Sequence, residues 1–261
     1  LFTVMYASDY VLRKSKQMRT IVKGFLPILG VMIFTGALVF VEPDLGALIV
    51  ITAIAMGILF LGGLTLRVIL SLGILAPMGV WGAILISPYK QARIQGFLDP
   101  WSSENVLGSG YQTTQAQMAF GNGEFFGTGV GNSVVKQFFL PEAHTDFIMA
   151  IIGEEFGLFG VTIVLGLFAF LIVRMFGIAK ESIQNNRHFA ALIAQGVAIW
   201  FSIQCTINIA VNLGLFPTKG LTLPLLSFGG SSILVSIIAI AIVLRIDHEN
   251  RRNIRGQHYN K

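Results

Sequence analysis

"FIMAIIGEEFGLFGVTIVLGLFAFLIV", residues 147–173, decides the fold class of this chain. The stretch exceeds the roughly 20 apolar residues that cross a bilayer as a helix, and its only charged residues are Glu154 and Glu155. Hydrophobic residues make up 54% of the whole chain and charged residues only 12%, and 21 residues are phenylalanine. This composition lies outside the usual range of soluble domains. The sequence therefore predicts an integral membrane protein.

Comparable apolar stretches recur along the chain. Because most of them reach the length of a membrane crossing, we predict an all-α polytopic membrane protein, a bundle of about six transmembrane helices. Pro224 and the Gly229-Gly230 pair interrupt the last stretch, so we expect it to begin as a broken or re-entrant segment. The six predicted spans are residues 25–41, 45–66, 68–87, 147–173, 189–216 and 221–244.

The basic residues predict the orientation of these spans. Six spans place the connecting segments alternately on the two sides of the membrane, and one side receives all but four of the 18 Lys and Arg residues. By the positive-inside rule that side is cytoplasmic and includes the tail 245–261, whereas segment 88–146 is external. The net charge of +5 is thus a topology signal, and we expect no nucleic-acid partner. The four external cations are Lys90, Arg93, Lys136 and Lys219.

The chain begins at Leu1 within "LFTVMYASDYVL", which is typical of the end of a hydrophobic span. We therefore expect residues 1–261 to be one integral-membrane domain from a longer protein. A single cysteine, Cys205, excludes an intrachain disulfide and a cysteine metal cluster. In the external segment, "TTQAQMAF" (113–120) predicts a short helix on the membrane surface. Glycines at 127, 129 and 131 allow either loop packing, which we favour, or an anion-binding nest.

Polar side chains inside the predicted spans form two groups. Gln204, Asn208 and Asn212 are spaced by four residues, so they lie on one helix face that should point into the bundle. Hydrogen bonding between helices is the favoured role, with substrate contact as the alternative. The adjacent Glu154 and Glu155 point about 100° apart on a helix, and for both we favour structural pairing that shapes a cavity.

Further polar residues precede the span at 147–173. Thr145 is a plausible N-cap, which would place Asp146 in the first helical turn, where the helix dipole favours its charged form. A capping role and a chemical role both remain open for Asp146. Glu142 and His144 are expected to be positioning or surface groups, because one histidine without a second ligand makes a poor zinc site.

Two of these segments resemble a known family. "LPEAHTDFIMAIIGEEFG" (140–157) and "LFPTKGLTLPLLSFGGSS" (215–232), together with "EPDLG" (42–46) and loop 99–133, are similar to the SEDS family of cell-wall polymerases. The resemblance extends over essentially the whole chain and is closer to the family's division members than to its elongation members. It implies a protein of about ten spans, of which about four would precede this chain.

The resemblance also implies an activity. SEDS proteins polymerise peptidoglycan glycan from lipid II on the outer face of the bacterial cytoplasmic membrane, here at the division septum, with inversion at the anomeric carbon and release of undecaprenyl diphosphate. The implied partners are a class B penicillin-binding transpeptidase, divisome regulatory proteins and membrane lipids, and the implied cofactor is Mg²⁺ or Mn²⁺.

The family's functional residues map onto this chain as follows. Its essential aspartate corresponds to Asp146, as general base or metal ligand, and an important lysine corresponds to Lys219. We expect Lys219 to bind the substrate, together with Glu142, His144 and Lys136. Phe138 stands where the division members commonly have an acidic residue. Two alternatives remain, a lipid II flippase and a non-catalytic division scaffold, and the long external segment favours external chemistry over flipping.

Overall fold

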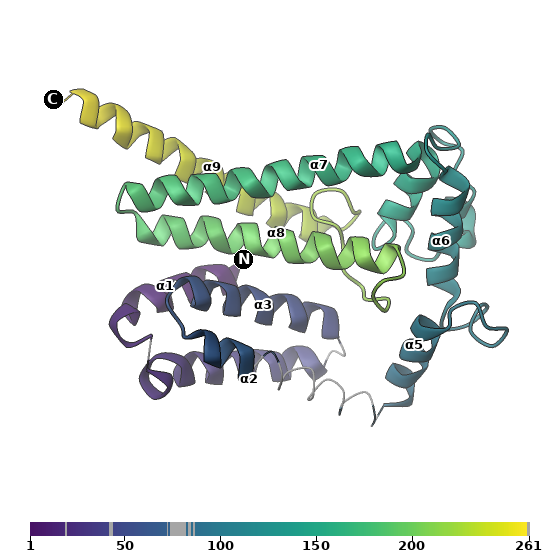
Figure 1. Cartoon of the computed structure of the whole chain (residues 1–261), viewed down its shortest axis with the longest axis horizontal. Helices are drawn as coiled ribbons and strands as arrows, with labels where there is room; N and C mark the ends of the chain where they lie inside the picture. The colour runs from purple at the N-terminus through teal and green to yellow at the C-terminus, as the bar shows by residue number, and fades with distance from the viewer. Residues whose placement is uncertain are drawn as a thin grey trace. The chain divides into compact units, whose positions relative to one another are not determined.

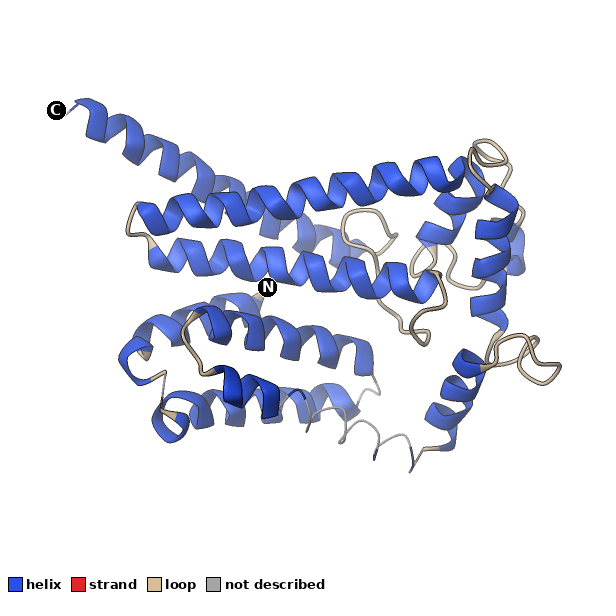
Figure 2. Ribbon diagram, in the orientation of Figure 1, coloured by secondary structure: helices blue, strands red, loops and turns tan. Residues whose placement is uncertain are grey.

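The computed structural model describes residues 1–18, 20–41, 44–71, 73, 82, 85 and 87–259. Within these residues the regular structure is entirely helical, as Figure 2 shows. The predicted all-α membrane fold is therefore confirmed. In the part of the chain that the structure describes, four helices are long and apolar enough to cross a membrane: Ile21–Val39, Ile148–Gln184, His188–Asn212 and Gly230–Asn253.

The other two predicted spans have different outcomes. The stretch predicted at 45–66 forms a shorter apolar helix, and the stretch predicted at 68–87 lies largely outside the described residues. The last predicted span does begin with a break, because residues 213–229 are a loop and the helix starts only at Gly230. That helix continues to Tyr259, so most of the predicted tail 245–261 is helical.

The chain forms two compact units, and each is described by itself. The first comprises Leu1–Leu72, Ala169–Ile203 and Leu234–Lys261, and the second comprises Gly73–Phe168 and Gln204–Ile233. Three long helices contribute residues to both units, namely α7 (Ile148–Gln184), α8 (His188–Asn212) and α9 (Gly230–Tyr259). The remaining elements, labelled in part in Figure 1, are α1 (Phe2–Arg13), η1 (Ser15–Gln17), η2 (Ile21–Phe25), α2 (Leu26–Val41), α3 (Leu45–Leu61), α5 (Pro88–Leu98), α6 (Tyr111–Gly123) and η3 (Val135–Phe139).

In the first unit, glycines allow helices to approach closely. A Cβ atom on Gly62, at the end of α3, would lie 2.4 Å from the side chain of Val11 in α1. A Cβ on Gly196 in α8 would lie 2.7 Å from Val4. Small residues at such crossings are the usual way in which membrane helices pack, because lipid supplies no hydrophobic drive for association.

Charged and polar residues join α7, the start of α8 and the second half of α9 in the same unit. Arg187, just before α8, forms an ion pair with Glu249 and donates to Asn250 Oδ1 at 3.0 Å. Asn250 in turn donates to Ser182 Oγ in α7 at 2.8 Å. Arg174 and Asp247 form a further pair at 3.2 Å. These contacts account for the polar residues that follow the apolar part of α9.

In the second unit, α7 is broken at Gly157, whose φ of 64° and ψ of −164° are not helical. The loop after α6 fills the break: the amides of Thr128 and Gly129 donate to the carbonyls of Glu154 and Glu155 at 2.9 and 3.1 Å. A Cβ on Gly127 would lie 2.1 Å from the Glu155 carbonyl, so only glycine fits there. The glycine-rich segment therefore packs against α7, and the amides of Thr128 and Gly129 are not available to an anion.

The helix predicted around 113–120 is α6, which runs from Tyr111 to Gly123. Its buried face, which includes Ala116 and Ala119, packs with Phe147 and Ala150 and with Val211 of α8. The helical prediction is confirmed, and the structure adds that one face of α6 belongs to the core of the second unit.

Candidate functional site

Asp146 lies in a turn that directly precedes α7. The Glu142 carbonyl accepts the amides of Thr145 and Asp146, both at 3.1 Å, and Glu142 itself has a φ of 58°. The prediction that Thr145 caps the helix is wrong: its hydroxyl donates to Glu142 Oε2 at 2.7 Å, and α7 begins at Ile148. Asp146 is accordingly in the turn rather than in the first helical turn.

The half-buried carboxylate of Asp146 faces the loop that carries Lys219. A Cβ atom built on Gly220 would lie 3.6 Å from Asp146 Oδ2. Because Lys219 is the residue before Gly220, the acidic and basic residues selected from the sequence belong to two segments that meet. The structure thus brings together Asp146 and the loop 217–220 from positions more than 70 residues apart in the sequence.

The polar face of α8 forms hydrogen bonds with both the turn that contains Asp146 and the loop that follows Lys219. Asn208 and Asn212 each donate from Nδ2 to the Asp146 carbonyl at 2.9 Å. Asn208 also donates to the Leu221 carbonyl at 2.6 Å, and Gln204 donates to the Thr222 carbonyl at 2.8 Å. The predicted common face and inward orientation are confirmed. Asn208 and Gln204 bond to a turn and a loop, whereas Asn212 also bonds to another helix, because its Oδ1 accepts the Ala150 amide of α7 at 3.1 Å.

Two further contacts hold this site from outside α8. Arg93 of α5 donates to the Thr218 carbonyl at 3.4 Å, beside Lys219. The Phe228 amide donates to the His144 carbonyl at 2.9 Å, which joins the end of the loop to the turn before Asp146. Arg93 was one of the four external cations in the sequence, but no spacing pattern indicated that it would reach Thr218.

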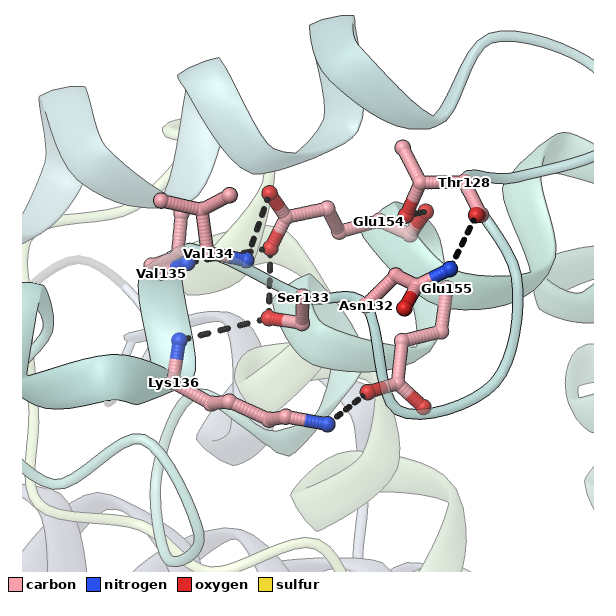
Figure 3. A network of polar contacts seen from close by, with 8 residues as sticks. All are labelled: Thr128, Asn132, Ser133, Val134, Val135, Lys136, Glu154 and Glu155. Atoms are coloured by element: carbon pink, nitrogen blue, oxygen red, sulfur yellow. Dashed lines mark hydrogen bonds and ion pairs between the residues drawn. The ribbon is translucent and has the colours of Figure 1, made fainter.

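Glu154 is completely buried and binds the segment that leads into η3, as Figure 3 shows. Its carboxylate accepts the Ser133 hydroxyl at 2.5 Å and the amides of Val134 and Val135 at 3.3 and 3.2 Å. A carboxylate that accepts three donors is well compensated for its burial. Glu154 therefore anchors the external segment a few residues before the turn of Asp146, which agrees with the structural role predicted for it.

Glu155 points away from this network and forms an ion pair with Lys136, also drawn in Figure 3. Lys136 was predicted to bind substrate. Its ammonium group is paired with Glu155 in this structure, so a contact between Lys136 and substrate stays a prediction. His144 and Glu142 are exposed beside Asp146. Their predicted roles toward substrate also remain predictions.

A side chain at position 220 is expected to cover the Asp146 carboxylate. Gly220 is exposed and its Cβ would make only ordinary contact with Asp146, so Gly220→Leu should fold normally. We expect the catalytic rate of the intact protein to fall about tenfold or more with this change, because small displacements of the groups at a reacting centre reduce the rate strongly. Gly121→Leu, at an exposed position of α6 with open space around it, is the matched control. Equal activity of the two variants would show that Gly220 does not border the site.

Over nearly its whole length, the chain matches the family model of the FtsW/RodA/SpoVE cell cycle proteins, from residue 1 to residue 252. The chain therefore belongs to this family of multi-pass membrane proteins. The resemblance seen in the sequence is confirmed.

Named relatives and solved structures agree with this assignment. The chain is 50% identical over 98% of its length to the "Probable peptidoglycan glycosyltransferase FtsW" of Aromatoleum aromaticum and 48% identical to that of Burkholderia thailandensis. It spans 62% and 55% of those two proteins. A structure described as "Structural coordination of polymerization and crosslinking by a peptidoglycan synthase complex" superposes with a TM-score of 0.70 at 27% identity, covering 95% of this chain and 70% of that one. The rod shape determining protein RodA of Thermus thermophilus shares the fold, with a TM-score of 0.60 at 23% identity, over 95% of this chain and 65% of that protein.

Proposed function

We propose that the intact protein is a peptidoglycan glycosyltransferase that joins lipid II units into glycan strands at the outer face of the cytoplasmic membrane. The observation that carries the proposal is the meeting of the Asp146 carboxylate with the Lys219 loop, both fastened by α8. Family membership and the names of the relatives support the same activity.

The reaction requires a base for the acceptor hydroxyl and positive charge for the departing diphosphate. Asp146 is the candidate base, since it is half-buried in a turn beside a loop and can accept a proton from a sugar hydroxyl. That hydroxyl attacks the anomeric carbon with inversion, and the bond to undecaprenyl diphosphate breaks. Lys219, with Arg93 at the neighbouring carbonyl, would stabilise the negative charge that develops on the diphosphate.

These residues could bind a divalent cation with one carboxylate, that of Asp146. The described part of the chain contains no cluster of three His, Cys, Asp or Glu residues that would hold a metal. Mg²⁺ needs no such cluster, because it is usually bound by one or two carboxylates together with substrate phosphates and water. Asp146 would then hold the ion, which would supply charge neutralisation at the diphosphate.

The proposed cellular setting follows from the charge distribution and the relatives. The excess of Lys and Arg on one side supports a cytoplasmic C-terminus and an external site. The structural neighbour described as a polymerising and crosslinking complex supports a class B penicillin-binding transpeptidase as partner. The FtsW relatives support action at the division septum with divisome regulators.

The test is an assay of the intact protein with its transpeptidase partner in vesicles that contain fluorescent lipid II. The proposal expects labelled glycan strands of increasing length. Transfer of label across the vesicle membrane without polymer would instead identify a flippase. An absence of both polymer and transfer would identify a scaffold.

Lys219 provides a residue-level prediction. A hydrogen bond to a charged group contributes about 1.5–3 kcal/mol, so Lys219→Ala should slow polymerisation by about 10- to 100-fold. The initial rate of strand formation measures this loss, and competition by free diphosphate should weaken in parallel. Lys180→Ala, at an exposed position near the end of α7, is the control. An unaltered rate in Lys219→Ala would remove the lysine from the site.

A further inference from the structure

The side chain of Asn208 bonds to both of the segments that form the candidate site. Its amide nitrogen carries two hydrogens, and one is donated to the Asp146 carbonyl at 2.9 Å while the other is donated to the Leu221 carbonyl at 2.6 Å. Leu221 is two residues beyond Lys219, and its amide donates to the Lys219 carbonyl at 2.7 Å. One planar group therefore joins the carboxylate segment to the lysine loop.

Two other side chains of this face also bond to these segments. Asn212 bonds to the turn and start of α7, through the Asp146 carbonyl at 2.9 Å and the Ala150 amide at 3.1 Å. Gln204 bonds to the loop, through the Thr222 carbonyl at 2.8 Å. These three side chains can therefore be compared with one another. Asn212 bonds to the segment that carries the carboxylate, Gln204 bonds to the loop and Asn208 bonds to both.

The bridge is buried and its hydrogen bonding is complete. Asn208 is 1% exposed and Asn212 is fully buried. Asn212 Nδ2 also approaches Asn208 Oδ1 at 3.3 Å, so the Asn208 amide has partners on both its nitrogen and its oxygen. A fully satisfied buried network is rigid, because any rotation of the amide leaves at least one carbonyl without a donor.

We propose that Asn208 is a positioning residue that fixes the separation between the Asp146 carboxylate and the Lys219 loop. The proposal rests on the glycosyltransferase function above, since those two segments carry the base and the cation of that reaction. A base and a leaving-group cation must act on two atoms of one substrate pair, and a misplacement of about 1 Å can cost about 100-fold in rate. Asn208 acts through Asp146 and Lys219 and does not itself touch the substrate.

The experiment replaces Asn208 by leucine, which is similar in size and cannot donate a hydrogen bond. In the intact protein with its transpeptidase partner, we expect kcat for glycan synthesis to fall about 10- to 100-fold and KM for lipid II to change less than about threefold. Gln204→Leu, which removes the contact to the Thr222 carbonyl in the loop, should lose several-fold less. If Asn208→Leu does not fold, Asn208→Thr retains one donor and should show an intermediate loss of kcat. A normal kcat in whichever variant folds overturns the proposal.

A double-mutant cycle separates positioning from a general loss of stability. Because Asn208 acts in part through the carboxylate, Asn208→Leu should cause a loss of kcat several-fold smaller in an Asp146→Asn background than in the wild type, measured over long incubations. Losses that multiply in the double variant would overturn the proposal. A wild-type protein that makes no glycan would contradict the glycosyltransferase function itself, whereas an active wild type with an unaffected Asn208→Leu variant would contradict only the positioning role.

Discussion

Asp146→Asn in the intact protein is expected to reduce glycan polymerisation by about 100- to 10,000-fold, the usual contribution of a general base. Asparagine has the same shape but cannot accept the proton of the acceptor hydroxyl. The Asp146 carbonyl, which receives the bonds from Asn208 and Asn212, is part of the backbone and is unchanged by the substitution. The fold should therefore survive while the reaction is lost.

Initial rates of strand formation from lipid II measure this effect, and thermal unfolding in detergent checks the fold. Asp99→Asn is a matched control, because Asp99 is an exposed acid at the end of α5. Polymerisation by Asp146→Asn within threefold of the wild-type rate would rule out the carboxylate as the base.

Glu154→Leu is expected to destabilise the protein by about 2 kcal/mol or more. The change leaves two buried donors, the Ser133 hydroxyl and the Val135 amide, without their acceptor, and it also removes the acceptor of the amide of the exposed Val134. Each buried donor left unsatisfied costs about 1–3 kcal/mol. Denaturant unfolding in micelles gives the free energy, and gel filtration gives the yield of folded protein.

The neighbouring glutamate supplies the control for this prediction. Glu155→Gln keeps a hydrogen-bond acceptor opposite Lys136 and removes only the negative charge, so its cost should be smaller, near 1 kcal/mol. Equal destabilisation by the two substitutions would mean that the three bonds to Glu154 contribute little.

Much of the membrane fold could be predicted from apolar length alone. The stretches 147–173 and 189–216 became α7 and α8, and Pro224 with Gly229-Gly230 correctly indicated a loop before α9. The break at Gly157 was not predicted, because a glycine within an apolar helix is common and usually tolerated. The break depends on the amides of Thr128 and Gly129, which come from another part of the chain and satisfy the carbonyls that it frees.

Part of the candidate site could also be predicted from the spacing of residues in the sequence. Spacing by four identified the face of α8, and the angle between adjacent helical residues correctly predicted separate surroundings for Glu154 and Glu155. Spacing cannot identify the partners of a side chain, and here they include the backbone carbonyls of Asp146, Leu221 and Thr222 and the Ala150 amide. The mistaken helix cap at Thr145 has the same origin, since Glu142 competes locally for its hydroxyl.

The most direct measurement is a structure of the intact protein with lipid II bound in the donor and acceptor positions. We expect an Asp146 carboxylate oxygen within about 3.2 Å of the acceptor hydroxyl, or of an ion bound to the diphosphate. A carboxylate turned away from both sugars and from any bound ion would rule out its role in the reaction.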